Sequence, residues 1–328
     1  MISYLRKYLY KNDQVPILSK FDKYKIKPPK KYKKKKVFYI IKKDRWRGIF
    51  SNVHHVLLHT IYAQKKNYTP IVDMKFFPTI YNEIKKINKS FNAWDYYFKN
   101  TKEKIDEIYK NYKYVFSDEI NLDTSKIKKK DYKDYKKILR NLKFDDKIIF
   151  LCKKFKKKKF KKKRILGVHF RGSDQITAAS HPFPPTSDQI IKITKEIFYK
   201  NKFNLIFLVT EDDTYLNIFK KTFGEKLIYF DSYRSNNIFK NYPRKNHRYL
   251  LGLETIVNMI LLSKTDFMIH SNSNFSTMAT HFSKKKIPEI IIYNGINSKN
   301  IFLSKFLWYF KSYLPYKFGG FENKIIKK

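Results

Sequence analysis

The second half of the chain alternates short apolar runs with longer amphipathic segments, and this pattern limits the possible folds more than any other feature. The apolar runs are predicted as strands: RILGVHF (164–170), LIFLV (205–209), KLIYF (226–230), DFMIH (266–270) and EIIIY (289–293). Helical spacing of apolar residues marks SDQIIKITKEIFYKN (187–201), DTYLNIFKKTFG (213–224) and a segment at about 249–263. Apolar strands separated by helices predict a parallel sheet that is covered on both faces.

The first half opens with a similar unit. The buried strand VFYII (37–41) precedes a glycine turn at Gly48 and a helix, and the strand YTPIVDM (68–74) follows. The rest of this half is more irregular, with EKIDEIYKNYKYVF (103–116) and YKKILRNLKF (135–144) as predicted helices. Because 328 residues suffice for two domains, we predict an α/β fold of two Rossmann-like domains that face each other across a cleft.

The predicted boundary lies in the basic run KKFKKKKFKKKR (153–164) and divides the chain into 1–155 and 156–328. The whole chain carries a formal net charge of +44. A nucleic-acid binder usually concentrates its lysines on one face, whereas here lysine is inflated together with Asn, Ile, Tyr and Phe, as is typical of an AT-rich genome. We therefore do not expect nucleic acid as the physiological partner, although such a surface attracts anionic lipid head groups.

Cysteine content and hydropathy bear on the cellular compartment in which the protein is expected. The one cysteine, Cys152, excludes an internal disulfide framework and a multi-cysteine zinc site. No stretch approaches the roughly 18 apolar residues of a membrane span, and the start, MISYLRKYLYKNDQ, lacks the apolar core of a secretory signal. We expect a cytoplasmic protein, and the basic surface also suits peripheral contact with the inner face of a membrane.

Polar side chains follow four of the predicted strands at their carboxyl ends, where open α/β sheets bind ligands. Arg171 follows the first strand, and its planar fork binds two phosphate oxygens at once. The turn SNSNFS (271–276) precedes a helix, so its hydroxyls and backbone N–H groups suit a second phosphate. Asp212 and Asp213 repel phosphate and suit ribose hydroxyls or the N–H edge of a base. Together these residues predict a site for a nucleotide-linked ligand.

The stretch GVHFRGSD (167–174) resembles the His-x-Arg-(Arg or Gly)-x-Asp motif of the GDP-fucose-dependent glycosyltransferases. That superfamily contains the α1,6-fucosyltransferases, the nodulation fucosyltransferases and the protein O-fucosyltransferases. Other segments are similar to its further landmarks, in the same order along the chain: GIFSNVHHVLLHTIYAQ (48–64), NAWDYYF (92–98), FLVTEDD (207–213) and GLETIVNMILLSKTDFMIHSNSNFSTMA (252–279). The resemblance is therefore spread over the chain and is more specific than the arginine motif alone.

The resemblance implies a GT-B fold in which 156–328 binds the donor and 1–155 lies on the acceptor side. It implies that Arg171 is a catalytic residue that holds the β-phosphate of the donor. The other donor-binding residues are expected to be His169, Asp212, Asp213, Asn258, Ser273, Asn274, Ser276, Gly48, His54 and His55. The implied reaction transfers fucose from GDP-fucose to a hydroxyl of a glycan or lipid-linked oligosaccharide, with inversion and without a metal ion or cofactor.

Several positions depart from the pattern of the superfamily. Many relatives have lysine where this chain has Gln175, and several have glutamate, proposed to activate the acceptor hydroxyl, at Ala178 or Ala179. Asn258 stands where an aspartate is thought to read guanine, which leaves room for a different nucleotide. The general base is therefore unassigned. The candidates are, in order, Asp174, His181 and Glu211.

Other interpretations of the same residues stay open. His169 also fits a buried structural histidine, one of the two histidines at 54 and 55 is expected to pack, and the turn at 271–276 also fits a simple helix cap. Of the adjacent aspartates, one is expected to cap a helix and the other to bind. The segment 302–328 is expected to pack on the opposite domain, with an interfacial anchor as the alternative. The alternative functions are transfer of another nucleotide sugar, a catalytically silent nucleotide-sugar or glycan-binding module, and charge-driven nucleic-acid binding.

Overall fold

The computed structural model describes residues 34–42, 47–99, 104–124, 127–172, 175–235 and 243–328. The chain divides into two compact units. Unit 1 comprises Met1–Ile149 and Phe239–Thr255, and unit 2 comprises Phe150–Ile238 and Ile256–Lys328. The division falls slightly before the predicted boundary, and it assigns a later segment of the chain to the first unit.

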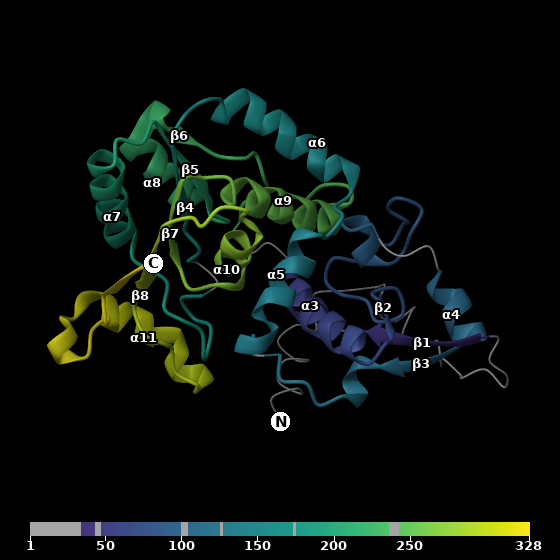
Figure 1. Cartoon of the computed structure of the whole chain (residues 1–328). Helices are drawn as coiled ribbons and strands as arrows, with labels where there is room; N and C mark the ends of the chain where they lie inside the picture. Colours follow the sequence, from purple (N-terminus) through teal and green to yellow (C-terminus); the bar gives the residue numbers. More distant parts are fainter. Residues whose placement is uncertain (1–33, 43–46, 100–103, 125–126, 173–174, 236–242) are drawn as a thin grey trace. The chain divides into compact units, whose positions relative to one another are not determined.

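Unit 1 is built on a three-stranded parallel sheet in the order β2-β1-β3 (Figure 1). Its strands are β1 (Lys34–Ile41), β2 (Thr69–Val72) and β3 (Tyr112–Phe116). Its helices are α3 (Ile49–Lys65), α4 (Ile105–Asn111) and α5 (Tyr132–Arg140), with short 3-10 turns at Ala93–Tyr96, Ser117–Glu119 and Lys129–Asp131. The predicted succession of strand, glycine turn, helix and strand at the start of this unit is confirmed.

One prediction for unit 1 is wrong. The segment 103–116 is not a single helix, because α4 ends at Asn111 and the chain continues directly as β3. Tyr112, Tyr114 and Phe116 of β3 pack against the buried cluster that contains Phe38 of β1. Aromatic residues on alternate positions favour a strand when one face is buried, and this long-range packing outweighs the helical pattern of the preceding residues.

The segment from 243 to 255 joins unit 1 through an aromatic contact. The hydroxyl of Tyr97 donates a hydrogen bond to the carbonyl oxygen of Tyr249 at 3.0 Å, and the two rings stack with centroids 5.8 Å apart. At Gly252 any Cβ would lie 2.5 Å from Cζ of Tyr97, so only glycine permits this approach. The segment 92–98, which carries part of the family resemblance, is therefore largely structural here.

Unit 2 contains a six-stranded sheet in the order β6-β5-β4-β7-β8-β9, parallel throughout except for the pair β8–β9. Its strands are β4 (Ile165–His169), β5 (Leu205–Val209), β6 (Leu227–Ile228), β7 (Phe267–Ser271), β8 (Glu289–Tyr293) and β9 (Lys324–Lys327). Its helices are α7 (Ser187–Lys200), α8 (Asp213–Phe223), α10 (Asn274–Phe282) and α11 (Ile301–Tyr313), while α6 (Asp146–Phe155) and α9 (His247–Leu262) each contribute residues to both units. All five strands predicted for the second half are present.

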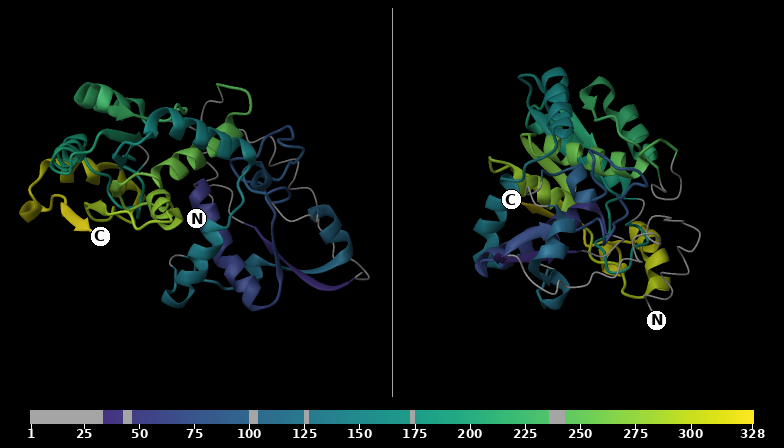
Figure 2. Two further views of the ribbon diagram at one scale, coloured as in Figure 1. Left: turned by 45° about the horizontal axis from the view of Figure 1, so that its top comes forward. Right: turned by 90° about the vertical axis from the view of Figure 1, so that its right-hand side faces the viewer.

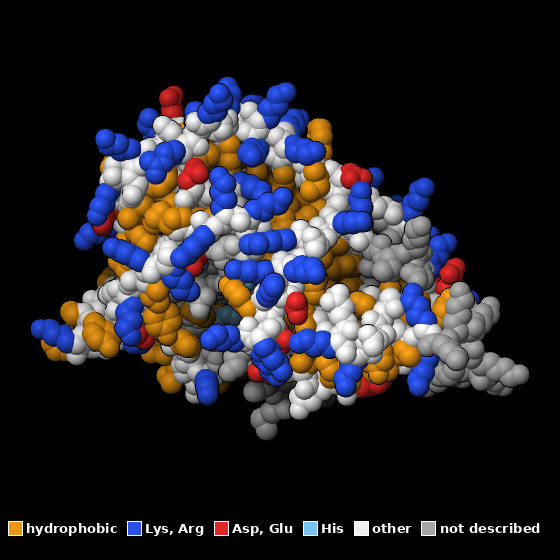
Figure 3. All heavy atoms as spheres, in the orientation of Figure 1, with side chains coloured by type: hydrophobic (Ala, Val, Ile, Leu, Met, Phe, Trp, Pro, Cys, Tyr) orange, Lys and Arg blue, Asp and Glu red, His pale blue; other side chains and the backbone are white. Residues whose placement is uncertain are grey.

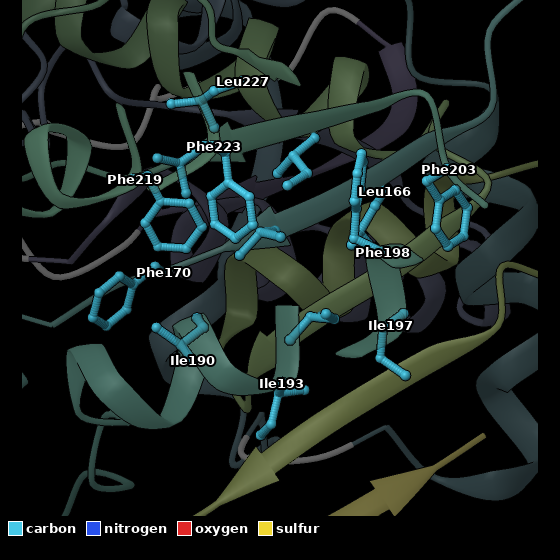
Figure 4. Packing of buried hydrophobic residues seen from close by; sticks show 14 of the residues in the cluster. Leu166, Phe170, Ile190, Ile193, Ile197, Phe198, Phe203, Phe219, Phe223 and Leu227 are labelled. Carbon is cyan, nitrogen blue, oxygen red and sulfur yellow. The ribbon is translucent and has the colours of Figure 1, made fainter. Parts of the chain in front are cut away.

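Helices cover both faces of the sheet in unit 2, as predicted. On one face, β4 and β5 pack against α7 and α8 in a cluster that includes Leu166, Phe170 and Phe219 (Figure 4). On the other face, Phe207 of β5 meets Phe155 and Phe160 at the end of α6. The basic run at 153–164 is therefore not a simple linker, since most of it continues α6 through a short π-helical turn that buries an aromatic ring.

The C-terminal segment packs on its own unit, so the expectation that it packs on the opposite domain is wrong. Trp308 of α11 donates its indole N–H to the carbonyl oxygen of Pro184 at 2.9 Å. Phe321 is buried against Phe183, and β9 pairs antiparallel with β8. The left view of Figure 2 draws α11 and β9 (yellow) at the edge of this unit.

Basic side chains are spread widely over the face of the molecule that Figure 3 shows, and they occur over both units. Within the described ranges, no helix is both long and apolar enough to cross a membrane.

Candidate functional site

The order of the strands in unit 2 places a ligand site between two of them. From β4 the chain proceeds through β5 to β6 on one side, and it then returns to β7 on the other side of β4. The strand order therefore reverses between β4 and β7. In open α/β sheets, ligands bind outside the carboxyl ends of the strands at this switch point. The residues that follow β4 and β7 are Phe170, Arg171 and the start of α10.

Arg171 lies at the carboxyl end of β4 and is oriented by a carboxylate from the loop that follows the neighbouring strand β5. The backbone N–H of Phe170 donates to the carbonyl oxygen of Val209 at 2.9 Å, which extends the pairing of β4 with β5 up to the arginine. The Nε atom of Arg171 then donates to Oε1 of Glu211 at 3.1 Å. The two side chains are 34% and 29% exposed, so the guanidinium is held in place and still accessible to a ligand.

A packed aromatic pair explains the glycine of the arginine motif. Tyr215 of α8 stacks on Phe170, with ring centroids 4.0 Å apart and an interplanar angle of 22°. The same tyrosine ring lies against Gly172, where a Cβ would come within 2.5 Å of its hydroxyl oxygen. Close packing of the Tyr215 ring therefore favours glycine at position 172, beside Arg171. The sequence analysis did not single out Tyr215, because one aromatic residue on an amphipathic helix does not differ from an ordinary core residue.

The serine-rich turn after β7 caps α10 with its own side chains. Ser273 is the N-cap residue, and its Oγ accepts the backbone N–H of Ser276 at 3.2 Å. The hydroxyl of Ser276 is fully buried and donates to the carbonyl oxygen of Ser271 at 3.0 Å. These hydroxyls therefore serve the cap, the alternative that the sequence left open. Asn274, the first residue of α10, is exposed at the positive end of the helix dipole.

His169 lies under the first turn of α10. The residue is 5% exposed, and its ring stacks on that of Phe275, with centroids 4.4 Å apart and an interplanar angle of 24°. In the sheet, His169 is in register with Val209 of β5 and His270 of β7. His169 therefore packs under the helix that begins at the switch point, as expected for a buried structural histidine. The same position places His169 beside the candidate site.

A second buried histidine lies beside it on β7. His270 Nε2 is 3.0 Å from Oε2 of Glu289 on β8, and its Nδ1 is 2.9 Å from the carbonyl oxygen of Ser271. Burial raises the pKa of Glu289, but the hydrogen bond and the charge of His270 outweigh burial and hold that pKa below its usual value. This pair ties β7 to β8 immediately below the start of α10.

One of the two aspartates after β5 caps helix α8, as predicted. Asp212 is buried and accepts the backbone N–H of Thr214 at 2.8 Å, so it is the N-cap of α8. Asp213 is the first residue of that helix and is exposed. The prediction that one of the pair caps a helix is confirmed, while binding by the other stays a prediction.

Several buried polar atoms have no hydrogen-bond partner among the described residues. They include Oδ1 of Asn258 on α9, Oε1 of Gln175 and the hydroxyl of Ser271, and these three residues are 6%, 5% and 1% exposed. A buried polar group without a partner costs free energy. Groups of this kind in unit 2 are candidates to accept ligand contacts, and Asn258 and Gln175 are among the positions at which this chain departs from the fucosyltransferase pattern.

The remaining predicted residues fall outside the described part of the chain, on a loop of unit 2 or in unit 1. Asp174 falls outside the described residues, and His181 is exposed on the loop that precedes α7. Gly48, His54 and His55 belong to unit 1. Gly48 is the N-cap residue of α3, and the two histidines lie on that helix. His54 Nδ1 is 2.8 Å from Tyr135 Oη, and His55 Nε2 is 3.0 Å from the carbonyl oxygen of Lys42, both within unit 1. No cluster of His, Cys, Asp and Glu within the described ranges is suited to hold a metal ion.

The two α/β units, one with a parallel sheet and the other with a mostly parallel one, define a GT-B-like fold, as predicted. Solved structures of the α1,6-fucosyltransferase NodZ share it: one soaked with GDP-fucose aligns with a TM-score of 0.51 at 15% identity, over 78% of this chain and 95% of that one. A second, co-crystallised with GDP, gives a TM-score of 0.52 at 14% identity over the same shares, and NodZ from Bradyrhizobium gives 0.50 at 14%. No protein-family model and no curated protein matches the chain. At these identities the likeness concerns the fold.

Proposed function

We propose that the protein is a glycosyltransferase that moves fucose from GDP-fucose to a hydroxyl of a glycan. The observation that carries this proposal is the position of Arg171 at the carboxyl end of β4, the strand that borders β7 and its turn into α10 at the switch point of unit 2. A guanidinium and a helix N-terminus are two separate binding features for the two phosphates of a nucleoside diphosphate. The NodZ structures with the same fold, solved with GDP and with GDP-fucose, support guanosine diphosphate as the first ligand to test.

In this proposal unit 2 binds the donor and unit 1 contributes to the acceptor side. Arg171 holds the β-phosphate, and Glu211 acts as a positioning residue that fixes the arginine through its Nε atom. The N-terminus of α10, including Asn274, meets the other phosphate. Asp213 accepts a hydroxyl or N–H group of the nucleoside, and Asn258 offers its buried carbonyl oxygen to the base.

The proposed reaction is a single displacement. The acceptor oxygen attacks C1 of the sugar, the bond from C1 to the β-phosphate oxygen breaks, and GDP leaves with the electron pair, so the configuration at C1 inverts. Arg171 and the N–H groups of α10 stabilise the charge that develops on the diphosphate, without a metal ion. Removal of one such preorganised group costs about 2.7–4 kcal/mol in the transition state.

The acceptor proton passes to a general base, for which Asp174 and His181 are the candidates. The sequence also offered Glu211 as a candidate base. Its carboxylate already accepts a hydrogen bond from Arg171, which makes Glu211 less suited to accept the acceptor proton. A variant series separates these roles. Loss of turnover with GDP affinity retained is expected for the base, whereas Glu211→Gln is expected to weaken GDP binding through the arginine.

Titration of the purified chain with GDP, UDP, CDP and ADP at moderate salt tests the proposal, followed by GDP-fucose turnover measured by mass spectrometry with and without a chelator. We expect preference for GDP and slow hydrolysis of GDP-fucose that the chelator does not change. Preference for another nucleotide indicates a donor that carries that nucleotide in place of GDP. Tight GDP binding with no turnover on any glycan acceptor favours the silent module, and binding that only follows salt concentration favours a charge-driven polyanion binder.

A further inference from the structure

Helix α11 packs on the rest of unit 2 through the face that carries fewer of its large apolar residues. The face that contacts unit 2 carries Ser304, Trp308 and Lys311, at the spacing of successive helical turns. Ser304 is fully buried and its hydroxyl donates to the carbonyl oxygen of Thr177 at 3.0 Å. In a surface helix of a globular protein the apolar stripe normally faces the core. Here the inner face carries a buried serine, a lysine and the indole of Trp308, which packs on Phe321 with ring centroids 6.0 Å apart.

The opposite face of α11 is apolar and exposed. Phe302, Phe306, Tyr309, Phe310 and Tyr313 are spaced three or four residues apart and form one stripe, and they are 76%, 59%, 50%, 66% and 87% exposed. Figure 3 shows orange side chains beside blue ones at the lower left, where Figure 1 draws α11. Exposed aromatic stripes of this extent mark interaction surfaces rather than ordinary solvent-facing helices.

A tight turn extends the stripe beyond the end of the helix. Gly319 adopts the left-handed conformation with φ of 87°, and a Cβ at Gly320 would clash with the carbonyl oxygen of Leu314, so the turn depends on both glycines. Lys311 Nζ donates to the carbonyl oxygen of Gly319 at 2.6 Å and fixes the turn to the helix. The tip of this turn carries two further exposed aromatic residues, Tyr316 and Phe318.

The charge around this surface is positive. The last thirty residues, 299–328, contain one acidic residue, Glu322, which is paired with Lys324 at 2.7 Å. Their lysines are Lys299, Lys305, Lys311, Lys317, Lys324, Lys327 and Lys328. Two of them lie over aromatic rings of the surface: Lys305 Nζ is 5.8 Å from the ring centroid of Phe302, and Lys317 Nζ is 5.0 Å from that of Phe318. Cations and apolar rings therefore share one side of the segment.

We propose that the exposed face of α11 and the turn at 314–318 bind the surface of an anionic lipid bilayer, a property that goes beyond the proposed reaction. Helices with aromatic residues on one face and lysines at its margins lie in the plane of the interface, with the apolar face roughly 5–10 Å deep at the head-group boundary. Aromatic side chains favour this depth, and lysines are attracted to anionic head groups.

Charge decides between a bilayer and a second copy of the chain. A symmetric dimer through α11 would place the lysines of one copy against those of the other, on a chain whose formal net charge is already +44. Like charges at an interface oppose association. An anionic membrane instead supplies the opposite charge over an extended plane together with an apolar layer for the rings.

The test must separate this face from the general positive charge, which alone attracts anionic vesicles. Flotation of the full chain with vesicles of phosphatidylcholine containing about a third phosphatidylglycerol is measured at low salt and at about 0.5 M salt, where exposed charges are strongly screened. The test variant replaces Phe302, Phe306 and Phe310 by serine. The matched control replaces Ile84, Phe150 and Tyr199 by serine, which are 68%, 62% and 69% exposed on other parts of the chain.

We expect binding that persists in part at high salt and falls about tenfold or more in the test variant, while the control behaves as the unmodified chain. Circular dichroism and GDP titration, expected to be unchanged, show that the test variant is folded and that lipid binding is separate from the donor site. Equal high-salt binding by test variant and control overturns the proposal. A concentration-dependent oligomer in sedimentation that the test variant abolishes also overturns it, since a second copy then covers the face.

Discussion

Replacement of Gly172 by alanine is predicted to destabilise unit 2 next to the proposed donor site. A Cβ at this position would lie 2.5 Å from the hydroxyl oxygen of Tyr215 and 2.8 Å from its Cζ, closer than van der Waals contact. The ring cannot withdraw freely, because it stacks on Phe170 at 4.0 Å. Overpacking of this kind costs about 1–3 kcal/mol, so Gly172→Ala should lower the free energy of unfolding by about that amount.

A double-mutant cycle with Tyr215→Ala tests the cause as well as the size of the effect. Tyr215→Ala alone should destabilise the protein, because the stacking on Phe170 is lost. Without the ring, however, the added methyl of Gly172→Ala has room, so its cost should nearly vanish in that background. Urea unfolding of the four proteins, followed by circular dichroism, measures the cycle. Losses that simply add, or unchanged stability of Gly172→Ala, would refute the packing argument.

Three further outcomes follow from the same geometry. Asp212→Ala should cost about 1 kcal/mol in urea unfolding through loss of the α8 cap, and Asp212→Asn, which can still accept the N–H group, should cost less. Burial raises the pKa of Glu289, but His270 lowers it further, so the folded pKa lies below the usual 4.5. The charged form of Glu289 therefore stabilises the fold above about pH 4.5, and this stabilisation is lost as the pH falls further. Glu289→Gln should lose less stability than the unmodified chain when the pH is lowered to about 3. Cys152 is buried, which raises the pKa of its thiol to about 12, so alkylation in the folded protein at about pH 8 should be much slower than in urea, and fast labelling without denaturant would contradict its burial.

The sheet of unit 2 could be predicted closely from sequence, because each central strand is buried on both faces and is therefore largely apolar up to its carboxyl end. β4, β5 and β7 show this pattern, and the polar residues after them mark where the burial ends. β3 was less predictable, since it follows α4 directly and its aromatic residues fit either structure. β9 was not predicted either, because its sequence KIIK is short and exposed and pairs only through the edge of β8.

The candidate site could be predicted in its composition but not in its contacts. Polar ends of strands indicate which residues gather at one edge of the sheet, and the arginine, the acidic pair and the serine turn do so. Which hydroxyl caps a helix depends on geometry, and Ser273 and Ser276 proved to bond to the turn itself. The pairing of Arg171 with Glu211 joins residues forty positions apart, and such long-range pairs leave no local pattern.

The affinity of Arg171→Ala for GDP tests the central claim most directly. Its matched control is Arg164→Ala, which removes the same charge just before the amino end of β4, where the arginine is exposed and donates to the carbonyl oxygen of Asn201. A charge-assisted contact contributes about 1.5–3 kcal/mol, so calorimetry should show GDP affinity lowered by about tenfold or more for Arg171→Ala and unchanged for Arg164→Ala. Equal GDP affinity of the two variants and the unmodified chain would contradict a phosphate site at the end of β4.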